Sequence, residues 1–273
     1  MGRREFLGAV GAAAAASRRA SATLIPTLGR ASALRIAVFR EPGFPAVAGA
    51  CDPASLEAAL AGLDVTFVGV AGLAHLAPRT TDLLVLPYGS AFPKQAWSDL
   101  LGFLADGGNL LVLGGVPFAV PVAREGDAWV PESPQANYHK KIGLTHAYPV
   151  TSLGGMTLGA PDSGEESLVA GLDVRRAFAG YWRFTRTRSV PSEDGSDGER
   201  EAMLTPLVTL LDAGGTRLAA PVVQVDRLEG PFAGGRWVLA MCEGSIPAAA
   251  LRSLAERAAG GIRRLEIRPG FAC

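Results

Sequence analysis

The cysteines are the first residues that could do chemistry, because a thiol can act as a nucleophile or bind a metal. The chain has three of them, Cys51, Cys242 and Cys273, and their wide, odd-numbered spacing is typical neither of a disulfide framework nor of a zinc site. Cys242 follows an apolar run and precedes a helical segment, and a position near a helix N-terminus favours the thiolate. Small buried cysteines are also common packing residues. Cys242 is therefore a candidate reactive thiol, with core packing as the alternative.

Carboxylates would serve a different chemistry, the hydrolysis of glycosidic bonds. That reaction needs two carboxyl groups about 5–10 Å apart across the sugar. The sequence offers Glu41, Asp162, Glu165 and Glu166, but it places no two of them in a motif.

Two aromatic segments could bind a sugar. Tyr138 and His139, followed by two lysines, could stack on a ring and hydrogen-bond to it, or they could belong to a solvated loop. Trp182 could be a sugar platform or a core anchor. The sequence contains no phosphate-binding loop, dinucleotide fingerprint or metal-ligand spacing, so we expect no cofactor and no metal site.

Alternating strand and helix patterns must position these groups. Apolar, β-rich runs predict strands at 34–39, 65–70, 83–87 and 109–113, and helical spacing predicts helices at 53–62 and 94–106. This order is typical of an α/β, doubly wound, mainly parallel sheet. Three later strands, at 207–211, 218–225 and 236–241, with turns at 212–215 and 231–235, predict a β-rich C-terminal extension before a last helix at 246–259.

Ligands of such sheets bind where the parallel strands end, so the loops 40–45, 88–93 and 114–121 should meet at one edge. Glycines there leave room, and aromatic rings offer flat apolar faces. The sequence thus predicts a ligand or interface cleft from eight residues: Arg40, Glu41, Phe44, Tyr88, Gly89, Phe92, Gly114 and Gly115.

Three segments carry a family resemblance: DLLVLPYGSAFP at 82–93, FLADGGNLLVLGG at 103–115 and LAAPVVQVDRLEGPFAGGRWVLA at 218–240. Over 34–261 the chain resembles the class I glutamine amidotransferase-like domain. It is most similar to the flavodoxin-like versions fused to bacterial glycoside hydrolases, akin to the trimerisation domain of some β-galactosidases. The resemblance implies this fold and a link to carbohydrate metabolism.

The chain departs from the family at the nucleophile. A working amidotransferase places a Cys in a Gly-x-Cys-x-Gly elbow after a buried strand, where a His partner activates it. Here the matching strand runs into Gly114, Gly115, Val116 and Pro117, and none of the three histidines begins the His-x-Glu pair that the family supplies. We therefore expect a pseudoenzyme that serves binding or assembly. The alternatives are a glycan hydrolase in its own right and a thiol-dependent enzyme using Cys242.

The N-terminus reads as a targeting segment. Arg3 and Arg4 followed by Glu5, Phe6 and Leu7 match the twin-arginine export pattern, and the Ala/Gly run behind them is too short to span a membrane. Small-x-small sites place cleavage after Ala22 or Ala33. We expect a secreted or periplasmic protein that the twin-arginine machinery exports.

Domain organisation and charge complete the expectations. The sequence predicts a signal peptide at 1–33, the α/β domain at 34–261, and at 262–273 a tail or the start of a further β-module. The net charge of the chain is +0, of which the first 22 residues hold four arginines and one glutamate, so the remainder is mildly acidic. This argues against nucleic acid as a partner. A carbohydrate, a second copy of the chain or a glycoside hydrolase module remain as candidate partners, and no membrane span is expected.

Overall fold

The computed structural model describes residues 34–49, 51–150, 154–159, 166–183, 186–187 and 201–261. The predicted signal peptide, the predicted tail over 262–273, and the candidate carboxylates Asp162 and Glu165 lie outside the described residues.

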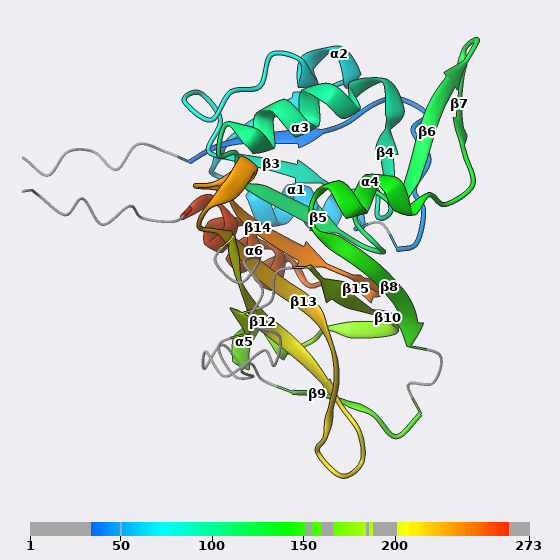
Figure 1. Cartoon of the computed structure of the whole chain (residues 1–273), viewed down its shortest axis with the longest axis vertical. Helices are drawn as coiled ribbons and strands as arrows, with labels where there is room; N and C mark the ends of the chain where they lie inside the picture. The colour runs from blue at the N-terminus through cyan, green and yellow to red at the C-terminus, as the bar shows by residue number, and fades with distance from the viewer. Residues whose placement is uncertain are drawn as a thin grey trace, which may run out of the picture. The chain divides into compact units, whose positions relative to one another are not determined.

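A nine-stranded sheet forms the centre of the domain (Figure 1). Its strand order is β11-β12-β13-β14-β5-β3-β1-β2, with β9 paired to β12. Neighbouring strands run parallel from β2 to β14, β13 is antiparallel to both β14 and β12, and β11 is parallel to β12. The strands are β1 (Arg35–Phe39), β2 (Asp64–Val68), β3 (Leu83–Leu86), β5 (Leu110–Leu113), β9 (Thr157–Gly159), β11 (Arg186–Thr187), β12 (Ala202–Leu211), β13 (Arg217–Arg227) and β14 (Arg236–Ala240). The structure is therefore a mixed α/β fold with a mainly parallel central sheet, which the later strands extend.

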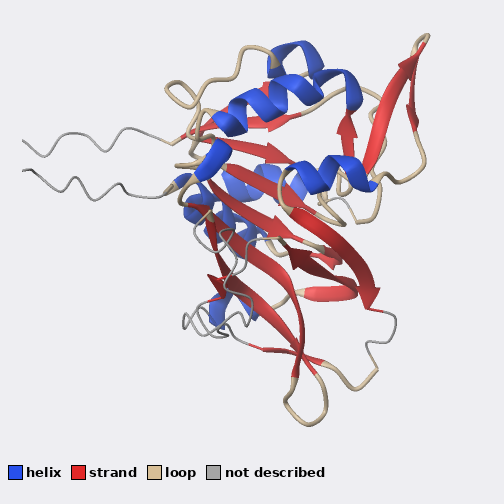
Figure 2. Cartoon of the chain, viewed as in Figure 1, coloured by secondary structure: helices blue, strands red, loops and turns tan. Residues whose placement is uncertain are grey.

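Helices cover both faces of this sheet (Figure 2). On one face, α1 (Pro53–Leu60) and α6 (Ala248–Ala259) pack on alternate residues of the central strands. On the other, α3 (Trp97–Ala105) packs with the 3-10 turn η1 (Lys94–Ala96) and the short helix α2 (Val70–Leu73). The start of α1 is the predicted one, because the Asp52 side chain accepts a hydrogen bond from the Ser55 amide at 2.8 Å and Pro53 opens the helix.

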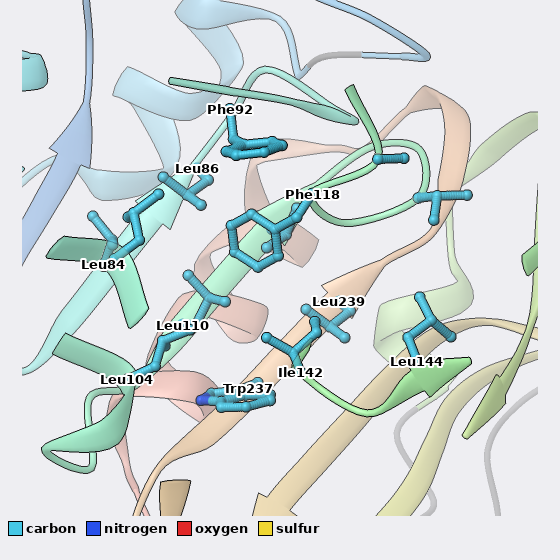
Figure 3. Packing of buried hydrophobic residues seen from close by; sticks show 14 of the residues in the cluster. Leu84, Leu86, Phe92, Leu104, Leu110, Phe118, Ile142, Leu144, Trp237 and Leu239 are labelled. Atoms are coloured by element: carbon cyan, nitrogen blue, oxygen red, sulfur yellow. The ribbon is translucent and has the colours of Figure 1, made fainter. Parts of the chain in front are cut away.

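Burial on both faces explains why the central strands are continuously apolar. β3 and β5 have the same sequence, Leu-Leu-Val-Leu, and every residue of the two strands is at most 3% exposed. Figure 3 shows leucines of both strands packed with Phe118, Trp237 and Leu239. The indole of Trp237 donates to the Gly108 carbonyl at 3.2 Å, which satisfies its buried N–H.

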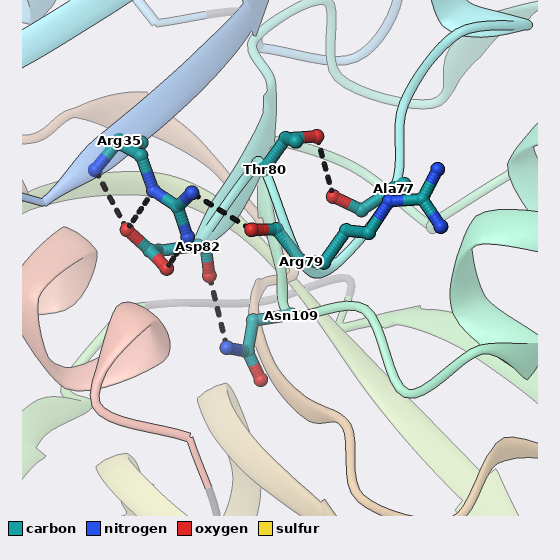
Figure 4. Close-up of polar contacts among 6 residues, drawn as sticks. All are labelled: Arg35, Ala77, Arg79, Thr80, Asp82 and Asn109. Atoms are coloured by element: carbon teal, nitrogen blue, oxygen red, sulfur yellow. Dashed lines mark hydrogen bonds and ion pairs between the residues drawn. The ribbon is translucent and has the colours of Figure 1, made fainter.

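Polar side chains tie the amino ends of the parallel strands together (Figure 4). The Arg35 guanidinium at the start of β1 donates to Asp82, just before β3, at 2.8 and 3.0 Å. The Asn109 amide before β5 donates to the Asp82 carbonyl at 2.9 Å and accepts from the Arg236 amide of β14 at 2.9 Å. These contacts fix the register at the edge opposite to the predicted cleft.

Two smaller sheets flank the central one. The first has the order β15-β10-β8 and the second has the order β4-β6-β7. Their strands are β4 (Ala91–Pro93), β6 (Val120–Glu125), β7 (Ala128–Pro131), β8 (Leu144–Val150), β10 (Asp173–Trp182) and β15 (Cys242–Ser245). The remaining elements are α4 (Ala136–Lys141), α5 (Glu166–Val169) and the 3-10 turn η3 (Gly230–Phe232). The last helix starts at Ala248, two residues later than the pattern predicted, with Pro247 as its N-cap residue.

Candidate functional site

The carboxyl ends of the parallel strands bring together the predicted loops. The amide of Gly89 donates to the Leu113 carbonyl at 3.0 Å, which ties the end of β3 to the end of β5. A further segment, 46–49, crosses these strand ends. Val47 donates to the Tyr88 carbonyl at 3.2 Å and its own carbonyl accepts from Ser90 at 2.8 Å. We call this segment the crossing segment; the sequence pattern did not identify its role.

The crossing segment covers the turn that follows β5, which the sequence resemblance matches to the nucleophile turn of an amidotransferase. Gly114 and Gly115 have φ values of +100° and +57° and are both buried. A Cβ at position 114 would lie 2.0 Å from the Gly49 carbonyl oxygen, and one at position 115 would lie 2.1 Å from the Ser90 hydroxyl oxygen. These distances are far below van der Waals contact, so no side chain fits at either position without movement of the loops around it.

The Ser90 hydroxyl is engaged rather than free. Ser90 is 4% exposed, and its oxygen accepts a hydrogen bond from the Val116 amide at 2.8 Å. The glycines Gly89, Gly114 and Gly115 thus allow close backbone packing and not the approach of a ligand. Gly89 itself is tightly enclosed, because a Cβ there would lie 1.9 Å from the Val47 carbonyl oxygen.

The predicted aromatic faces are committed to the core. Phe92 is 1% exposed and contacts Trp97 and Tyr138 as well as Phe118, which Figure 3 shows beside it. Phe44 is 7% exposed and contacts Phe39, Tyr88 and Trp129 at ring-centroid distances of 5.0 to 5.4 Å. The expectation that Phe44 and Phe92 offer free faces to a ligand is therefore wrong, because long-range aromatic partners bury both rings. Tyr88 is half-buried.

The charged residues of the predicted cleft have structural partners. Glu41 accepts from the Val70 amide at the start of α2 at 2.9 Å, and Arg124 lies 4.0 Å away. Arg40 forms an exposed ion pair with Glu57 of α1 at 2.9 Å, and its guanidinium lies 4.9 Å from the centroid of the Phe67 ring. Neither side chain is positioned with a second acid or base for catalysis.

One apolar pocket of about 200 Å³ opens beside this edge, between α1 and the ends of β1 and β2. Of the predicted residues, only Arg40 and Tyr88 line it. Its other walls include Leu56, Phe67 and Cys51. The sequence did not predict that Cys51 lines a pocket. Burial, with the nearby charge of Asp52, raises the pKa of the Cys51 thiol to about 12. The pocket is suited to apolar contact and not to nucleophilic chemistry at neutral pH.

The remaining chemical candidates also lie in packed surroundings. Cys242 begins β15, opposite Ala177 of β10, rather than a strand-to-helix turn, and burial raises the pKa of its thiol to about 12. Tyr138 packs on Phe92 and Trp97, and His139 is 7% exposed, so they do not form a solvated loop. Burial, together with Lys140 and His146, lowers the pKa of His139. Trp182 is 8% exposed and is a core residue.

Two further searches concern metals and membranes. Within the described ranges, no three His, Cys, Asp or Glu side chains are grouped in a way that could hold a metal ion. No helix in the part of the chain that the structure describes is long and apolar enough to cross a membrane.

Comparison with known proteins gives structural likenesses alone. No family model and no curated protein matches the sequence. Gan42B, a GH42 β-galactosidase, matches with a TM-score of 0.46 and 11% identity over 82% of this chain and 29% of its own. A β-galactosidase from Halorubrum lacusprofundi matches with a TM-score of 0.42 and 16% identity, over 84% and 31% of the two chains. A ThuA-like protein from Bacteroides uniformis matches with a TM-score of 0.38 and 10% identity, over 85% and 94%. The chain therefore spans 29% to 31% of the length of these two β-galactosidases.

Proposed function

We propose that this chain is an exported, non-catalytic module of a carbohydrate-processing protein, with a doubly wound, amidotransferase-like fold, and that it serves binding or assembly. The observation that carries the proposal is the sealed turn after β5. A nucleophile needs an exposed side chain and a base within about 2.6–3.2 Å. At Gly114 and Gly115 the crossing segment and Ser90 leave no space for any side chain.

The histidines support the same proposal. His75 lies between α2 and β3, His139 lies on α4 and His146 lies in β8, so none belongs to the loops that meet at the carboxyl edge. An elbow without a nucleophile, a base or room for either favours a structural use of the fold. The link to carbohydrate processing comes from the family resemblance of the sequence.

The two enzymatic alternatives have less support. A glycan hydrolase would draw on Glu41, but hydrogen bonding to α2 already engages that carboxylate. A thiol enzyme would need thiolate, but a thiol with a pKa of about 12 is protonated at neutral pH, and this holds for Cys51 and Cys242 alike.

The assembly surface in this proposal is the area around the apolar pocket. Phe67 is 47% exposed on β2, the strand at the edge of the sheet, and its ring lines the pocket. A second shallow groove of about 240 Å³ between α1 and β2 also contains Phe67, so the two hollows adjoin. An exposed aromatic ring beside an apolar hollow is typical of a docking surface.

Activity assays on the purified full chain test the non-catalytic part. We expect no glutamine hydrolysis and no hydrolysis of chromogenic glycosides above the buffer rate. Turnover that survives purification and disappears in Glu41→Gln or Cys51→Ser would overturn the proposal.

Sedimentation velocity over a range of concentrations tests the assembly part. Phe67→Ser should abolish self-association or binding to an added glycoside hydrolase module. The matched control is Leu218→Ser, because Leu218 is similarly exposed, at 42%, but lies on β13. Equal association of both variants and the parent chain would contradict a docking role for this surface.

A further inference from the structure

A second surface, on the small sheet β15-β10-β8, carries exposed aromatic rings. His146 and Tyr148 belong to β8, and Tyr181 belongs to the neighbouring strand β10. Tyr148 is 52% exposed and Tyr181 is 60% exposed, whereas most large apolar side chains of the domain are buried. We call His146, Tyr148 and Tyr181 the aromatic platform.

The register of the small sheet explains why these rings point outward. Tyr181 lies opposite His146, and Trp182 lies opposite Leu144, so Thr145 is an extra residue in β8. Its hydroxyl donates to the Tyr181 carbonyl at 2.8 Å. The bulge reverses the face of the sheet to which successive side chains of β8 point. As a result, Leu144 is fully buried, whereas His146 and Tyr148 lie on the outer face.

Alternation along β10 then separates the two faces. Phe178 and Trp182 point into the core and are 9% and 8% exposed, and Tyr181 points to the outside. Ala179 lies opposite Tyr148, so a small residue forms the floor beside that ring. The bulge in β8 and the alternation of side chains along β10 therefore determine that these aromatic rings point outward.

The rings form a corner. The Tyr148 and Tyr181 rings meet edge to face, with centroids 5.5 Å apart and planes at 77°. His146 and Tyr148 are nearly parallel, at 8°, with centroids 6.2 Å apart. A ligand ring lying against one tyrosine would meet the edge of the other, and two phenol groups and an imidazole would be within its reach as hydrogen-bonding partners.

The size of the platform favours a small ligand over a protein. A tyrosine presents roughly 150–250 Å² in all, so these two tyrosines, at 52% and 60% exposure, offer roughly 170–280 Å². A stable protein interface needs about 800 Å² from each partner. The exposed rings are therefore too small by themselves for a stable protein interface and suit a small ligand.

The charges near the platform favour a neutral ligand. Arg176 of β10 pairs with Glu243 at 2.8 Å, and Arg183, just after β10, lies 3.4 Å from Glu201. Binding of single-stranded nucleic acid to stacked aromatic residues needs a positively charged groove along the backbone. Here the two arginines are engaged with carboxylates, and the net charge of the chain is +0.

We propose that the aromatic platform binds a neutral oligosaccharide, with a sugar ring stacked on Tyr148 or Tyr181. The identification of the ligand as a sugar rests on the proposed function, whereas the location of the site rests on the exposed rings. C–H groups on the face of a pyranose pack on an aromatic ring, and its hydroxyls bond to the phenol and imidazole groups. The site is distinct from the pocket beside β1 and β2.

Titration calorimetry on the full chain tests the platform with a panel of hexaoses: cello-, xylo-, manno- and maltohexaose, together with β-1,4-galactotetraose. We expect one member to bind. Tyr181→Ala and Tyr148→Ala should each weaken that binding by about 5-fold or more, since loss of a ring on which a nucleic-acid base stacks costs about 1–3 kcal/mol. Leu218→Ala is the matched control, because Leu218 is an exposed apolar side chain, at 42%, on β13 of the central sheet, and this variant should bind like the parent.

Because both tyrosines are exposed, the variants should keep the parent's thermal midpoint, which separates loss of a contact from loss of the fold. The platform proposal would be overturned if no member of the panel bound. It would also be overturned if a variant with both Tyr148→Ala and Tyr181→Ala bound with unchanged affinity. Binding of an oligothymidine or self-association that the tyrosine substitutions abolish, with no sugar bound, would show that the surface serves another partner. None of these results would affect the non-catalytic proposal, which enzymatic turnover alone would overturn.

Discussion

The sealed turn after β5 makes a quantitative prediction, which compares Gly115→Ala with Gly126→Ala. The two glycines have almost the same φ, +57° and +58°. A Cβ at Gly126, in the turn between β6 and β7, meets nothing within 4 Å. A Cβ at Gly115 lies 2.1 Å from the Ser90 hydroxyl oxygen and 2.9 Å from the Ala48 Cβ. The pair therefore separates the steric effect from the backbone effect.

The magnitude follows from these contacts. The left-handed conformation costs any L-residue about 1–2 kcal/mol, and this cost is common to both variants. Gly115→Ala adds overpacking, at about 1–3 kcal/mol. If Ser90 moves away, the variant also leaves the buried Val116 amide without its acceptor, at about 1–3 kcal/mol. We expect Gly115→Ala to lower the free energy of unfolding by about 2–4 kcal/mol more than Gly126→Ala.

Urea denaturation of the two full-length variants measures the difference. With an m-value of about 1–3 kcal/mol/M, the midpoints should differ by about 1 M or more. In a Ser90→Gly background the steric cost of Gly115→Ala should fall by at least about 0.5 kcal/mol, because the nearest clashing atom is gone. Free energies of unfolding that agree within about 0.5 kcal/mol would refute the reasoning, since they would show room for a side chain at Gly115.

Three further predictions concern the strand register, the thiols and export. The hydrogen bonds from Arg35 hold the pKa of Asp82 below its usual value, so this carboxylate should stabilise the fold above about pH 4 and lose that effect as the pH falls through its folded-state pKa. Asp82→Asn should thus lower the urea midpoint at pH 7 and have little effect near pH 2; an equal loss at both would contradict it. Iodoacetamide at pH 7 should label Cys51 and Cys242 far more slowly than a free cysteine, because their thiol pKa values are about 12, and peptide mass spectrometry would reveal rapid labelling if this is wrong. Residues 1–33 should export a reporter that folds before transport, and changing Arg3 and Arg4 to Lys should stop it; continued export would rule out the twin-arginine assignment.

The sequence alone determined the elements whose signals are local. Apolar, β-rich runs predicted the four parallel strands at the start of the domain. The runs of β1, β3 and β5 are nearly continuous because these strands are buried on both faces, whereas β2 is the edge strand and keeps Asp64 and Thr66. Asp52 and Pro53 predicted the start of α1, because a cap and a fixed φ act within one turn. The turn at 212–215 was also readable, since Asp212 accepts hydrogen bonds from the Gly214 and Thr216 amides at 2.8 and 2.7 Å.

Only the tertiary structure decided which side chains are available to a ligand. Phe44 and Phe92 follow the ends of β1 and β3, as ligand-binding residues do, but Phe92 belongs to β4 and rings from other elements bury both side chains. A single extra residue, Thr145, exchanges the faces of β8 and leaves Tyr148 outside. Apolar periodicity indicates which residues of one helix or strand face a core. It does not indicate which distant segment fills the space above Gly114 or that Tyr181 stays uncovered. Both depend on contacts between residues far apart in the chain, and these contacts form by close packing only after the strands have assembled.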